Sequence, residues 1–307
     1  MPELDDYSRF EQLILKIDPQ SRLLHTWELT GGVSARVTAV EIEQPDGLDR
    51  RLVVRQHGSN DLQRNPNIAG DEFNLLQILQ SAGVPAPVPY YFDQSGDIFP
   101  APFVVVEYIE GHTEFSPVNR DDFLLSIATH LAQLHSTDWS RFDLSFLPDQ
   151  IALYNEKFTA RPTKLDDSLE EGRIRDMLEP AWPFPNRNRS VLLHGDYWPG
   201  NILWHKGRIA GIIDWEDAHV GDPLADLAIS RLEILWAFDM DAMRTFTSHY
   251  QSLVKLDFSS LPSWDLCAAL RPAFQIATWA GTPAREEAMR IKHHLFVAQA
   301  FEALSSY

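Results

Sequence analysis

The stretch that decides the fold reads VLLHGDYWPGNILW over residues 191–204 and, after a short gap, GIIDWE over residues 211–216. Two β-rich runs, 201–204 and 208–213, lie on either side of Lys206-Gly207. A pair of residues containing glycine between two such runs is typical of a β-hairpin turn. The sequence therefore predicts a hairpin whose tip lies at the glycine and whose open end carries polar residues.

Three oxygen-bearing side chains are expected at that open end. The hairpin places Asn201 beside Asp214, and an apolar strand before the His-Gly-Asp stretch would deliver Asp196 to the same end. Carboxylate and amide oxygens are hard ligands that suit Mg²⁺. Asp196 also stands five residues before Asn201, which is the spacing of the catalytic Asp and the metal-binding Asn in the catalytic loop of protein kinases. The pattern predicts phosphoryl transfer, with Asp196 as the catalytic base and Asn201 and Asp214 as metal ligands.

The chain before residue 110 has the pattern of an antiparallel sheet with accompanying helices. Short β-rich runs are separated by turn signals such as Pro45-Asp46-Gly47, and apolar residues recur at helical spacing from Ile68 to Ser81. In order, the sequence predicts a helix near 8–17, two strands within 27–43, a strand over 51–55, a helix over 68–81, and a strand pair around 95–97 that ends at 103–108.

Beyond Glu110-Gly111, where we expect a boundary between two lobes, apolar stripes at helical spacing dominate. The predicted helices cover 121–135, with Asp121 or Asp122 as the N-cap, 223–238 and most of 264–304, and a connector rich in Pro and Arg covers about 180–190. The fold class is therefore α+β, with a small antiparallel-sheet lobe over 1–110 and a larger, mainly helical lobe over 111–307.

Arg55 and Glu72 provide an independent indication in the sheet lobe. Glu72 shares a helix face with Leu76 and Leu79, and a carboxylate on an inward stripe needs a partner. Arg55, on the third predicted strand, is the candidate. Protein kinases place a phosphate-binding Lys on the corresponding strand and pair it with a helical Glu.

With these residues in place, the chain resembles the aminoglycoside phosphotransferase and choline kinase-like family. Its members carry His-Gly-Asp, four residues and Asn, and then Ile-Asp-Trp or Ile-Asp-Phe; GDPLADL over 221–227 is similar to the stretch that follows. The resemblance implies a protein-kinase-like fold with ATP or GTP between the lobes and Mg²⁺ on its phosphates. The acceptor would be a hydroxyl group of a small molecule, such as an aminoglycoside, an amino alcohol or a sugar.

The resemblance also implies nucleotide contacts in the sheet lobe. Arg55 departs from the family's usual Lys, keeping the charge but changing the shape that meets a phosphate. Gly32 and Ser34, in TGGVS, would cover the terminal phosphates, or the two adjacent glycines simply form a turn. The hinge would bond the base through the main-chain carbonyl of Glu107 and the N–H of Ile109.

Composition narrows the classes of partner. The 26 Lys and Arg and 44 Asp and Glu among 307 residues give a net charge of −18, opposite to the footprint of a nucleic-acid binder. Such charge attracts a cationic small molecule. The single cysteine, Cys267, has apolar neighbours and is expected to be an inert buried thiol. The acidic start and the lack of an apolar run of ~20 residues predict a cytoplasmic protein with no membrane span.

Two other functions remain open from the residues alone. A metal-dependent phosphohydrolase could use a cluster of histidines and carboxylates, and it would leave Asn201, Arg55 and Glu72 unexplained. Its cluster would be His194, Asp196, Asp214, Glu216 and His219. A catalytically silent nucleotide-binding module is motivated by Arg55 and the short glycine loop.

Several residues near the motif have structural interpretations. His194 is expected to brace the catalytic loop, and Asp222 to cap a helix that begins at Pro223. Asp226 would support the helix dipole or brace the loop. Glu216 would assist a metal ion or contact the acceptor. His293 and His294 are predicted to lie on a solvated helix face.

Overall fold

The computed structural model describes residues 6–29, 35–185 and 187–305. Their contacts divide the chain into two compact units, which are described separately. The first unit runs to His112 and also includes Leu203–Glu216; the second comprises Thr113–Ile202 and Asp217 onward. The sequence predicted one boundary near residue 110, whereas the chain returns to the first unit for the hairpin and Asp214.

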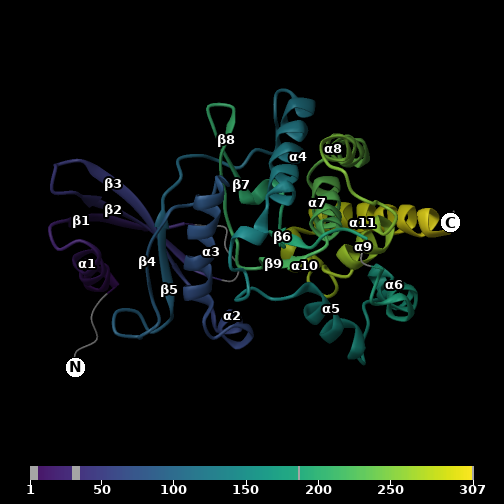
Figure 1. The fold of residues 1–307 in the computed structure, drawn as a ribbon, viewed down its shortest axis with the longest axis horizontal. Coiled ribbons are helices and arrows are strands. Elements are labelled where there is room, and N and C mark those ends of the chain that lie inside the picture. Colours follow the sequence, from purple (N-terminus) through teal and green to yellow (C-terminus); the bar gives the residue numbers. More distant parts are fainter. Residues whose placement is uncertain (1–5, 30–34, 186, 306–307) are drawn as a thin grey trace. The chain divides into compact units, whose positions relative to one another are not determined.

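The first unit is built on a five-stranded antiparallel sheet in the order β1-β2-β3-β5-β4. Figure 1 shows this sheet with the long helix α3 beside β4 and β5. The predicted antiparallel sheet is confirmed, and the sequence missed only the short helix α2. The elements are α1 (Asp6–Ile17), β1 (Arg22–Glu28), β2 (Arg36–Glu43), β3 (Asp49–Gln56), α2 (Ser59–Arg64), α3 (Ile68–Ala82), β4 (Pro89–Asp93) and β5 (Phe103–Glu107).

Strand β3 separates the hydrophobic core from the polar site. Its alternation buries Leu52 and Val54 in one core with Phe10 and Leu13 of α1. Because successive side chains of a strand point to opposite faces, Arg55 lies on the other face. A period of two in the sequence therefore positions a charged side chain away from the apolar core.

The predicted hairpin forms from β7 (Ile202–His205) and β8 (Arg208–Ile212). Lys206 and Gly207 have φ of 50° and 75°, the left-handed values that a two-residue type I′ turn requires. The hairpin is held to the rest of the first unit by Trp204, which pairs with His112, and by Ile212, whose N–H donates to Pro85 O at 2.6 Å.

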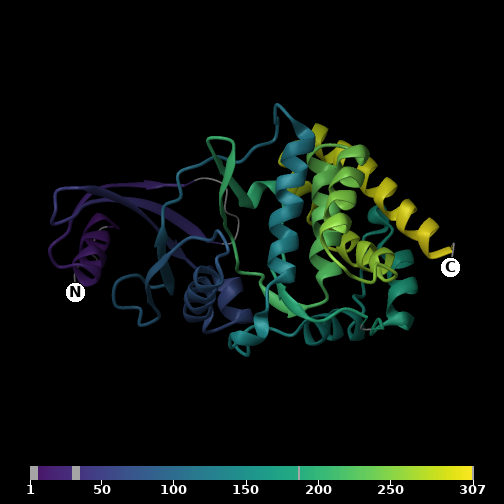
Figure 2. The same ribbon diagram turned by 45° about the horizontal axis from the view of Figure 1, so that its top comes forward.

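The second unit is mainly helical, as predicted. Figure 2 shows α4, α7 and α8 as neighbouring helices, which agrees with their contacts. Its helices are α4 (Arg120–Ser136), α5 (Gln150–Thr159), α6 (Glu171–Leu178), α7 (Pro223–Ala237), α8 (Met240–Leu253), α9 (Leu261–Ala269), α10 (Ile276–Ala280) and α11 (Pro283–Ser305). Short 3-10 turns lie at Trp139–Arg141, Asp167–Leu169, Glu179–Ala181 and Pro199–Asn201, and β6 (Val191–Leu193) pairs antiparallel with β9 (His219–Gly221).

Two local predictions in this unit are wrong. Helix α4 is capped by Asn119, whose side chain accepts from the N–H groups of Asp121 and Asp122, so these two acids lie in the first turn instead. His293 is fully buried on α11, where its Nε2 lies 2.9 Å from Ala269 O, while His294 is exposed as predicted. The helix face holding His293 therefore packs inward.

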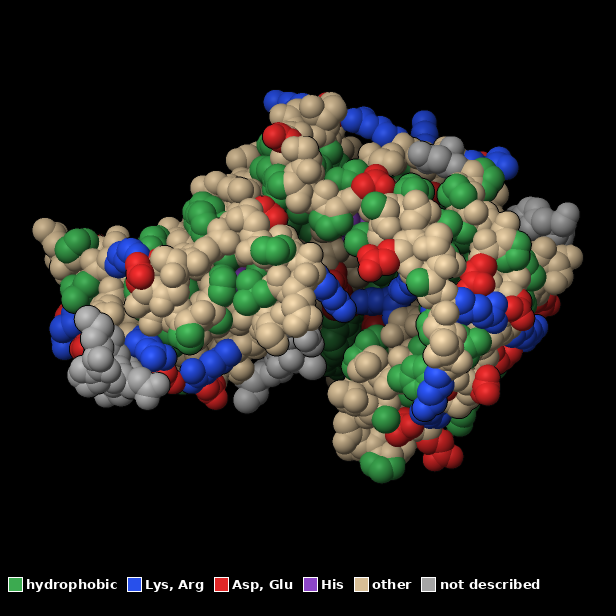
Figure 3. Space-filling model, turned by 90° about the horizontal axis from the view of Figure 1, so that it is seen from below, with side chains coloured by type: hydrophobic (Ala, Val, Ile, Leu, Met, Phe, Trp, Pro, Cys, Tyr) green, Lys and Arg blue, Asp and Glu red, His purple; other side chains and the backbone are tan. Residues whose placement is uncertain are grey.

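The single cysteine of the chain, Cys267, is buried, as the sequence predicted. On the face drawn in Figure 3, acidic and basic side chains are interspersed. None of the helices in the described ranges combines the length and the apolar character needed to cross a membrane.

Candidate active site

The His-Gly-Asp loop follows directly from the buried strand β6 and needs a glycine. Gly195 has φ of +81°, and a Cβ built on it would lie 2.2 Å from Asp217 O. A side chain at this position would collide with the neighbouring backbone and strain the left-handed conformation. Only glycine lets the loop pass this close to Asp217.

Asp226 anchors the same loop from within α7. It is fully buried, and its carboxylate accepts from the N–H groups of His194 at 2.7 Å and Gly195 at 2.8 Å. Burial by itself would raise the pKa of Asp226, but the hydrogen bond and charge of His135 outweigh it and hold the pKa below its ordinary value. Of the two predicted roles for Asp226, bracing the loop is confirmed.

Asp196 is held on both sides of its carboxylate. Asn201 Nδ2 donates to Asp196 Oδ2 and to its main-chain O, each at 2.9 Å. Arg271 Nη2 donates to Asp196 Oδ1 at 2.7 Å. The N–H of Asp196 donates to His194 Nδ1 at 3.2 Å, so His194 braces the loop, as predicted.

The amide of Asn201 is oriented for a ligand. Its nitrogen is committed to Asp196, and among the described residues no hydrogen-bond donor reaches its oxygen. An amide oxygen turned away in this manner is a hard ligand of the kind that Mg²⁺ takes. The donor set at Asn201 therefore fits the metal ion that the sequence predicted.

In the first unit, Arg55 binds three carboxylates. Its Nη1 donates to Glu72 Oε1 at 2.8 Å, and its Nη2 donates to Asp214 Oδ1 at 2.7 Å and to Glu216 Oε2. The pairing of Arg55 with Glu72, predicted from one strand and one helix face, is confirmed. Glu216, which the sequence connected with a metal ion or the acceptor, is a partner of Arg55 in this structure.

The side chains of Arg55 and Glu72 are largely buried, and the charge of each one shifts the pKa of the other. Desolvation by itself would lower the pKa of Arg55 and raise that of Glu72, because each would lose hydration as an ion. The carboxylates around Arg55 reverse this and raise its pKa. Its positive charge in turn holds the pKa of Glu72 at about 2. Arg55 and Glu72 are therefore both ionised at neutral pH, and their ion pair fixes β3 to α3.

Asp214 occupies a strained backbone position. Its φ is 68°, in the left-handed region that non-glycine residues seldom adopt. Strain of this kind costs about 1–3 kcal/mol and clusters at functional sites. The backbone at Asp214 therefore supports a functional role for its carboxylate, which already contacts Arg55.

A second cluster in the first unit combines one histidine with two acidic residues. His57, Asp61 and Glu216 each offer a ligand atom, and these atoms lie within 4.8 Å of one another. His57 is buried, with its Nε2 3.1 Å from Glu72 Oε2. The sequence did not single out His57 or Asp61, because neither follows a recognised spacing.

The hinge residues are shaped by a close approach in the hairpin. Glu107 is the last residue of β5, and Ile109 lies two residues after it. A Cβ on Gly211 would lie 2.3 Å from Ile109 Cδ1, so the absence of a side chain at Gly211 makes room for Ile109. The N–H of Glu107 donates to Val88 O at 2.8 Å. The predicted phosphate contacts Gly32 and Ser34 lie outside the described residues.

The structure thus brings together part of the predicted constellation. Asp196 meets Asn201, and Arg55 meets Glu72 and Asp214. The convergence of Asn201 with Asp214 stays a prediction, because these residues belong to different units. Arg271 was missed, since it lies 75 positions after Asp196 and no local pattern links the two.

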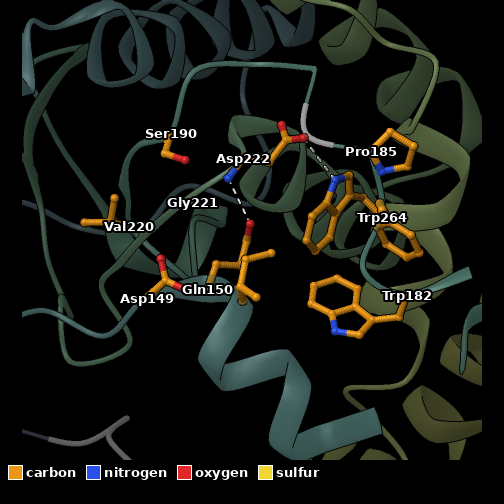
Figure 4. A pocket seen from close by; sticks show the side chains of 11 residues that line it. Asp149, Gln150, Trp182, Pro185, Ser190, Val220, Gly221, Asp222 and Trp264 are labelled. Carbon is orange, nitrogen blue, oxygen red and sulfur yellow. Dashed lines mark hydrogen bonds between the residues drawn. The ribbon is translucent and has the colours of Figure 1, made fainter.

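A pocket in the second unit contains none of the predicted site residues. Figure 4 shows Asp222 between Gln150, whose Oε1 accepts from the Asp222 N–H, and Trp264, whose Nε1 donates to Asp222 Oδ2. Asp222 also accepts from the N–H of Leu224 at 3.0 Å. It is the predicted N-cap of α7, and the pocket is built around that structural role.

This chain matches one family model and parts of several curated proteins. The model of the phosphotransferase enzyme family matches residues 26–252. Acyl-CoA dehydrogenase family member 10 of Mus musculus is 26% identical over 232 residues, which cover 70% of this chain and 21% of that protein. Protein LicA of Haemophilus influenzae is 25% identical over 163 residues, 52% of this chain and 57% of LicA. The chain therefore spans about a fifth of the first of these relatives and just over half of the second.

Solved structures show the same fold. The GDP and kanamycin complex of APH(2″)-IIIa has a TM-score of 0.63 and 18% identity, with 97% of each chain covered. A ternary complex of a thermostable mutant of aminoglycoside phosphotransferase APH(4)-Ia with AMP-PNP and hygromycin B has a TM-score of 0.62 and 15% identity, covering 95% of this chain and 98% of that one. Together with the family model, which matches well over half of the sequence, these findings show that this chain belongs to the phosphotransferase enzyme family.

Proposed function

We propose that this chain transfers the γ-phosphoryl group of ATP or GTP to a hydroxyl group of a small molecule. The observation that carries the proposal is how firmly Asp196 is held. Asn201 donates a hydrogen bond to its carboxylate, and the loop that contains it is anchored on the buried Asp226. A loop fixed by this many hydrogen bonds presents a base in one geometry. Membership of the phosphotransferase enzyme family supports the reaction type.

Asp196 acts as the base in this proposal. In phosphoryl transfer the transition state is loose, so that positioning and electrostatic stabilisation supply most of the catalysis. Asp196 orients the acceptor hydroxyl and takes its proton while the hydroxyl oxygen bonds to the γ-phosphorus. The bond from that phosphorus to the bridging oxygen breaks at the same time, and the nucleoside diphosphate leaves with the electron pair of that bond. Asn201 keeps the carboxylate of Asp196 in place. Each oxygen of that carboxylate retains a lone pair that can accept a hydrogen bond from the acceptor hydroxyl.

Asn201 and Asp214 are the proposed metal ligands. When bound, Mg²⁺ would neutralise charge on the phosphate oxygens. Arg55 would contact phosphates with the guanidinium that now bonds three carboxylates, and Glu72 would position it. We extend the proposal to Gly32 and Ser34 for the terminal phosphates, and to the main chain of Glu107 and Ile109 for the base.

The phosphohydrolase alternative has less support. Two of its proposed ligands already serve the backbone: His194 Nδ1 accepts from Asp196 N–H, and His219 Nδ1 lies 2.9 Å from Asp217 O. A silent nucleotide-binding module would retain Arg55 and Asp214, but it would not need Asp196 held for catalysis.

A screen for acceptor-dependent ADP release tests the proposal. Wild type, Asp196→Ala and Asp241→Ala are compared over aminoglycosides, amino alcohols, sugars and hydroxy acids. Asp241 is a matched control because its side chain is 91% exposed on α8. We expect Asp196→Ala to lower kcat by at least about a hundredfold and Asp241→Ala to leave it unchanged. Equal turnover in Asp196→Ala and wild type would refute the role of the base.

Nucleotide binding separates the two acidic residues. In calorimetric titrations with Mg·ATP, Asp214→Ala should bind more weakly than wild type, because it loses a ligand to the metal. Asp196→Ala should bind as tightly as wild type. Tight binding by Asp214→Ala would count against its role as a metal ligand.

A further inference from the structure

The carboxylate of Asp226, which anchors the His-Gly-Asp loop, is itself bonded to a histidine on another helix. His135, near the C-terminal end of α4, places its Nε2 3.3 Å from Asp226 Oδ2. The same Oδ2 accepts from the N–H of His194, while Oδ1 accepts from the N–H of Gly195. His135 therefore contacts the very oxygen that holds the loop at His194, and it restrains the rotation of the carboxylate.

Tyr250, on α8, extends this contact by one more residue. Its hydroxyl oxygen lies 2.6 Å from His135 Nδ1, and the two rings meet edge to face with their centroids 5.8 Å apart. The side chains of Tyr250, His135 and Asp226 are all buried. Because water does not reach these groups, it cannot replace a hydrogen bond that one of them loses.

The donor and the acceptor at each of these contacts follow from the two ends of the chain of hydrogen bonds. The carboxylate of Asp226, whose pKa is held below its ordinary value, accepts, so we assign the donated hydrogen to His135 Nε2. Burial raises the pKa of Tyr250, so its hydroxyl keeps its proton and donates to His135 Nδ1. The imidazole thus accepts from Tyr250 at one nitrogen and donates to Asp226 at the other.

These bonds connect three helices of the second unit to the loop. Helix α8 packs against both α4 and α7, as Figure 2 shows. The loop has a further bond to α4, because the Tyr197 hydroxyl donates to Ile127 O at 3.0 Å. The chain of hydrogen bonds through Asp226 ends at the two residues that directly precede Asp196. A rotation of the Asp226 carboxylate would therefore displace the proposed base.

We propose that His135 and Tyr250 are positioning residues for the phosphoryl transfer, and that they act through Asp226 on the loop that presents Asp196 to the acceptor. The inference rests on the proposed phosphotransferase function and adds two residues to it. Loss of either one should lower kcat, because the base then samples unproductive positions. Binding of Mg·ATP should change far less, since neither residue touches the proposed metal ligands or the phosphates.

Tyr250→Phe tests the outer residue, because it removes one hydroxyl and keeps the ring. With the best acceptor of the screen, we expect kcat to fall at least about fivefold, as for a lost buried hydrogen bond, and the Kd for Mg·ATP to stay within about twofold. His293→Leu is the control. His293 is fully buried on α11, where its Nε2 contacts Ala269 O, so this variant loses a buried imidazole outside the chain and should keep kcat. Circular dichroism verifies that each variant is folded.

Variants of His135 distinguish positioning from packing. His135→Gln keeps an N–H donor that can reach Asp226, whereas His135→Leu fills the space without a donor. We expect His135→Leu to lower kcat at least about tenfold, as for a lost hydrogen bond to a charged group, and His135→Gln to recover most of that loss. Adding Tyr250→Phe to His135→Leu should cost no further activity, because the hydroxyl acts through the imidazole. Equal kcat for the Leu and Gln variants, or effects that multiply in the double variant, would overturn the proposal.

Hydrogen exchange at the loop gives a readout that needs no turnover. The amide hydrogens of His194 and Gly195, followed by NMR, should exchange faster in Tyr250→Phe than in wild type, and His293→Leu should leave their exchange unchanged. Unchanged exchange in Tyr250→Phe, or faster exchange with an unchanged kcat, overturns the positioning role. A wild-type protein that forms no product with any acceptor contradicts the proposed function instead, and the catalytic part of this inference with it.

Discussion

Gly195 shows how a single residue determines the geometry of the catalytic loop. Its φ of +81° and the 2.2 Å approach of a Cβ to Asp217 O act together. Gly207, at the hairpin tip, has φ of +75° but nothing within 4 Å of a built Cβ. A side chain at either position would adopt the left-handed backbone conformation, but only a side chain at Gly195 would also collide with a neighbouring atom.

We expect Gly195→Ala to lower the free energy of unfolding more than Gly207→Ala does. The left-handed conformation costs about 1–2 kcal/mol for a residue with a Cβ, and only Gly195→Ala adds a collision, which should bring the loss above about 2 kcal/mol. Chemical denaturation of both variants measures the difference. Equal losses would mean that the loop shifts to accept the side chain.

The site residues differ in how far the sequence could identify them. Asp196 and Asn201 follow a spacing, and Arg55 and Glu72 follow strand and helix periodicity, so local patterns were sufficient. Arg271 lies 75 positions after Asp196 and is brought to it by the packing of the helical unit. Such a contact has no local signal, because it depends on tertiary structure.

At the scale of the element, Arg55 links strand β3 to helix α3. The side chains of Arg55 and Glu72 are 11% and 7% exposed. Removing one partner of a buried ion pair is costly, because the other charge is left without compensation. Exposed pairs, such as Arg22 with Glu43 on neighbouring strands, stabilise far less.

Arg55→Met should therefore destabilise the protein by about 3–5 kcal/mol, and Arg22→Met by less than about 1 kcal/mol. Arg55→Lys keeps the charge and should lose less than Arg55→Met, with activity retained. Urea unfolding monitored by circular dichroism provides the values. The account of this ion pair fails if Arg55→Met and Arg22→Met unfold at the same urea concentration.

Helix α7 carries a carboxyl group whose ionisation opposes folding. Burial raises the pKa of Glu233 from 4.5 to about 7, although Arg271 acts in the opposite direction. The native state therefore holds a proton that the unfolded state has released between these pH values. By linkage, this group makes the free energy of unfolding fall as pH rises from about 4.5 to about 7.

Glu233→Gln should remove this loss. Relative to wild type, the variant should gain stability progressively over that pH range, reaching at most about 3 kcal/mol above pH ~7. Denaturation at a series of pH values, with the exposed Glu287→Gln as control, measures the gain. A constant difference from wild type at all pH values would show that Glu233 is not perturbed.

Two of the helices that the sequence missed, α2 and α5, lack a regular apolar face. Helix α5 exposes Ile151 and Leu153, at 42% and 41%, so its stripe is broken. Helix α2 has six residues, too few for a periodicity to emerge. The buried His293 was placed on the surface because charged and polar residues surround it in sequence, whereas its helix face packs inward.

At the scale of the whole molecule, the family and the fold agree with what the motif over residues 191–216 predicts. The family model matches residues 26–252, and the structural relatives named above cover nearly the whole chain. Identity to those structures is 15–18%, so the likeness to them shows the fold alone.

Transfer of label from ATP tests the central claim most directly. ADP release alone does not distinguish transfer from hydrolysis, whereas label from the γ-phosphoryl group can be followed into an acceptor. With the best acceptor of the screen, we predict labelled product from wild type and at least about a hundredfold less from Asp196→Ala. Label found only in inorganic phosphate, or equally in the product of both proteins, would contradict the account.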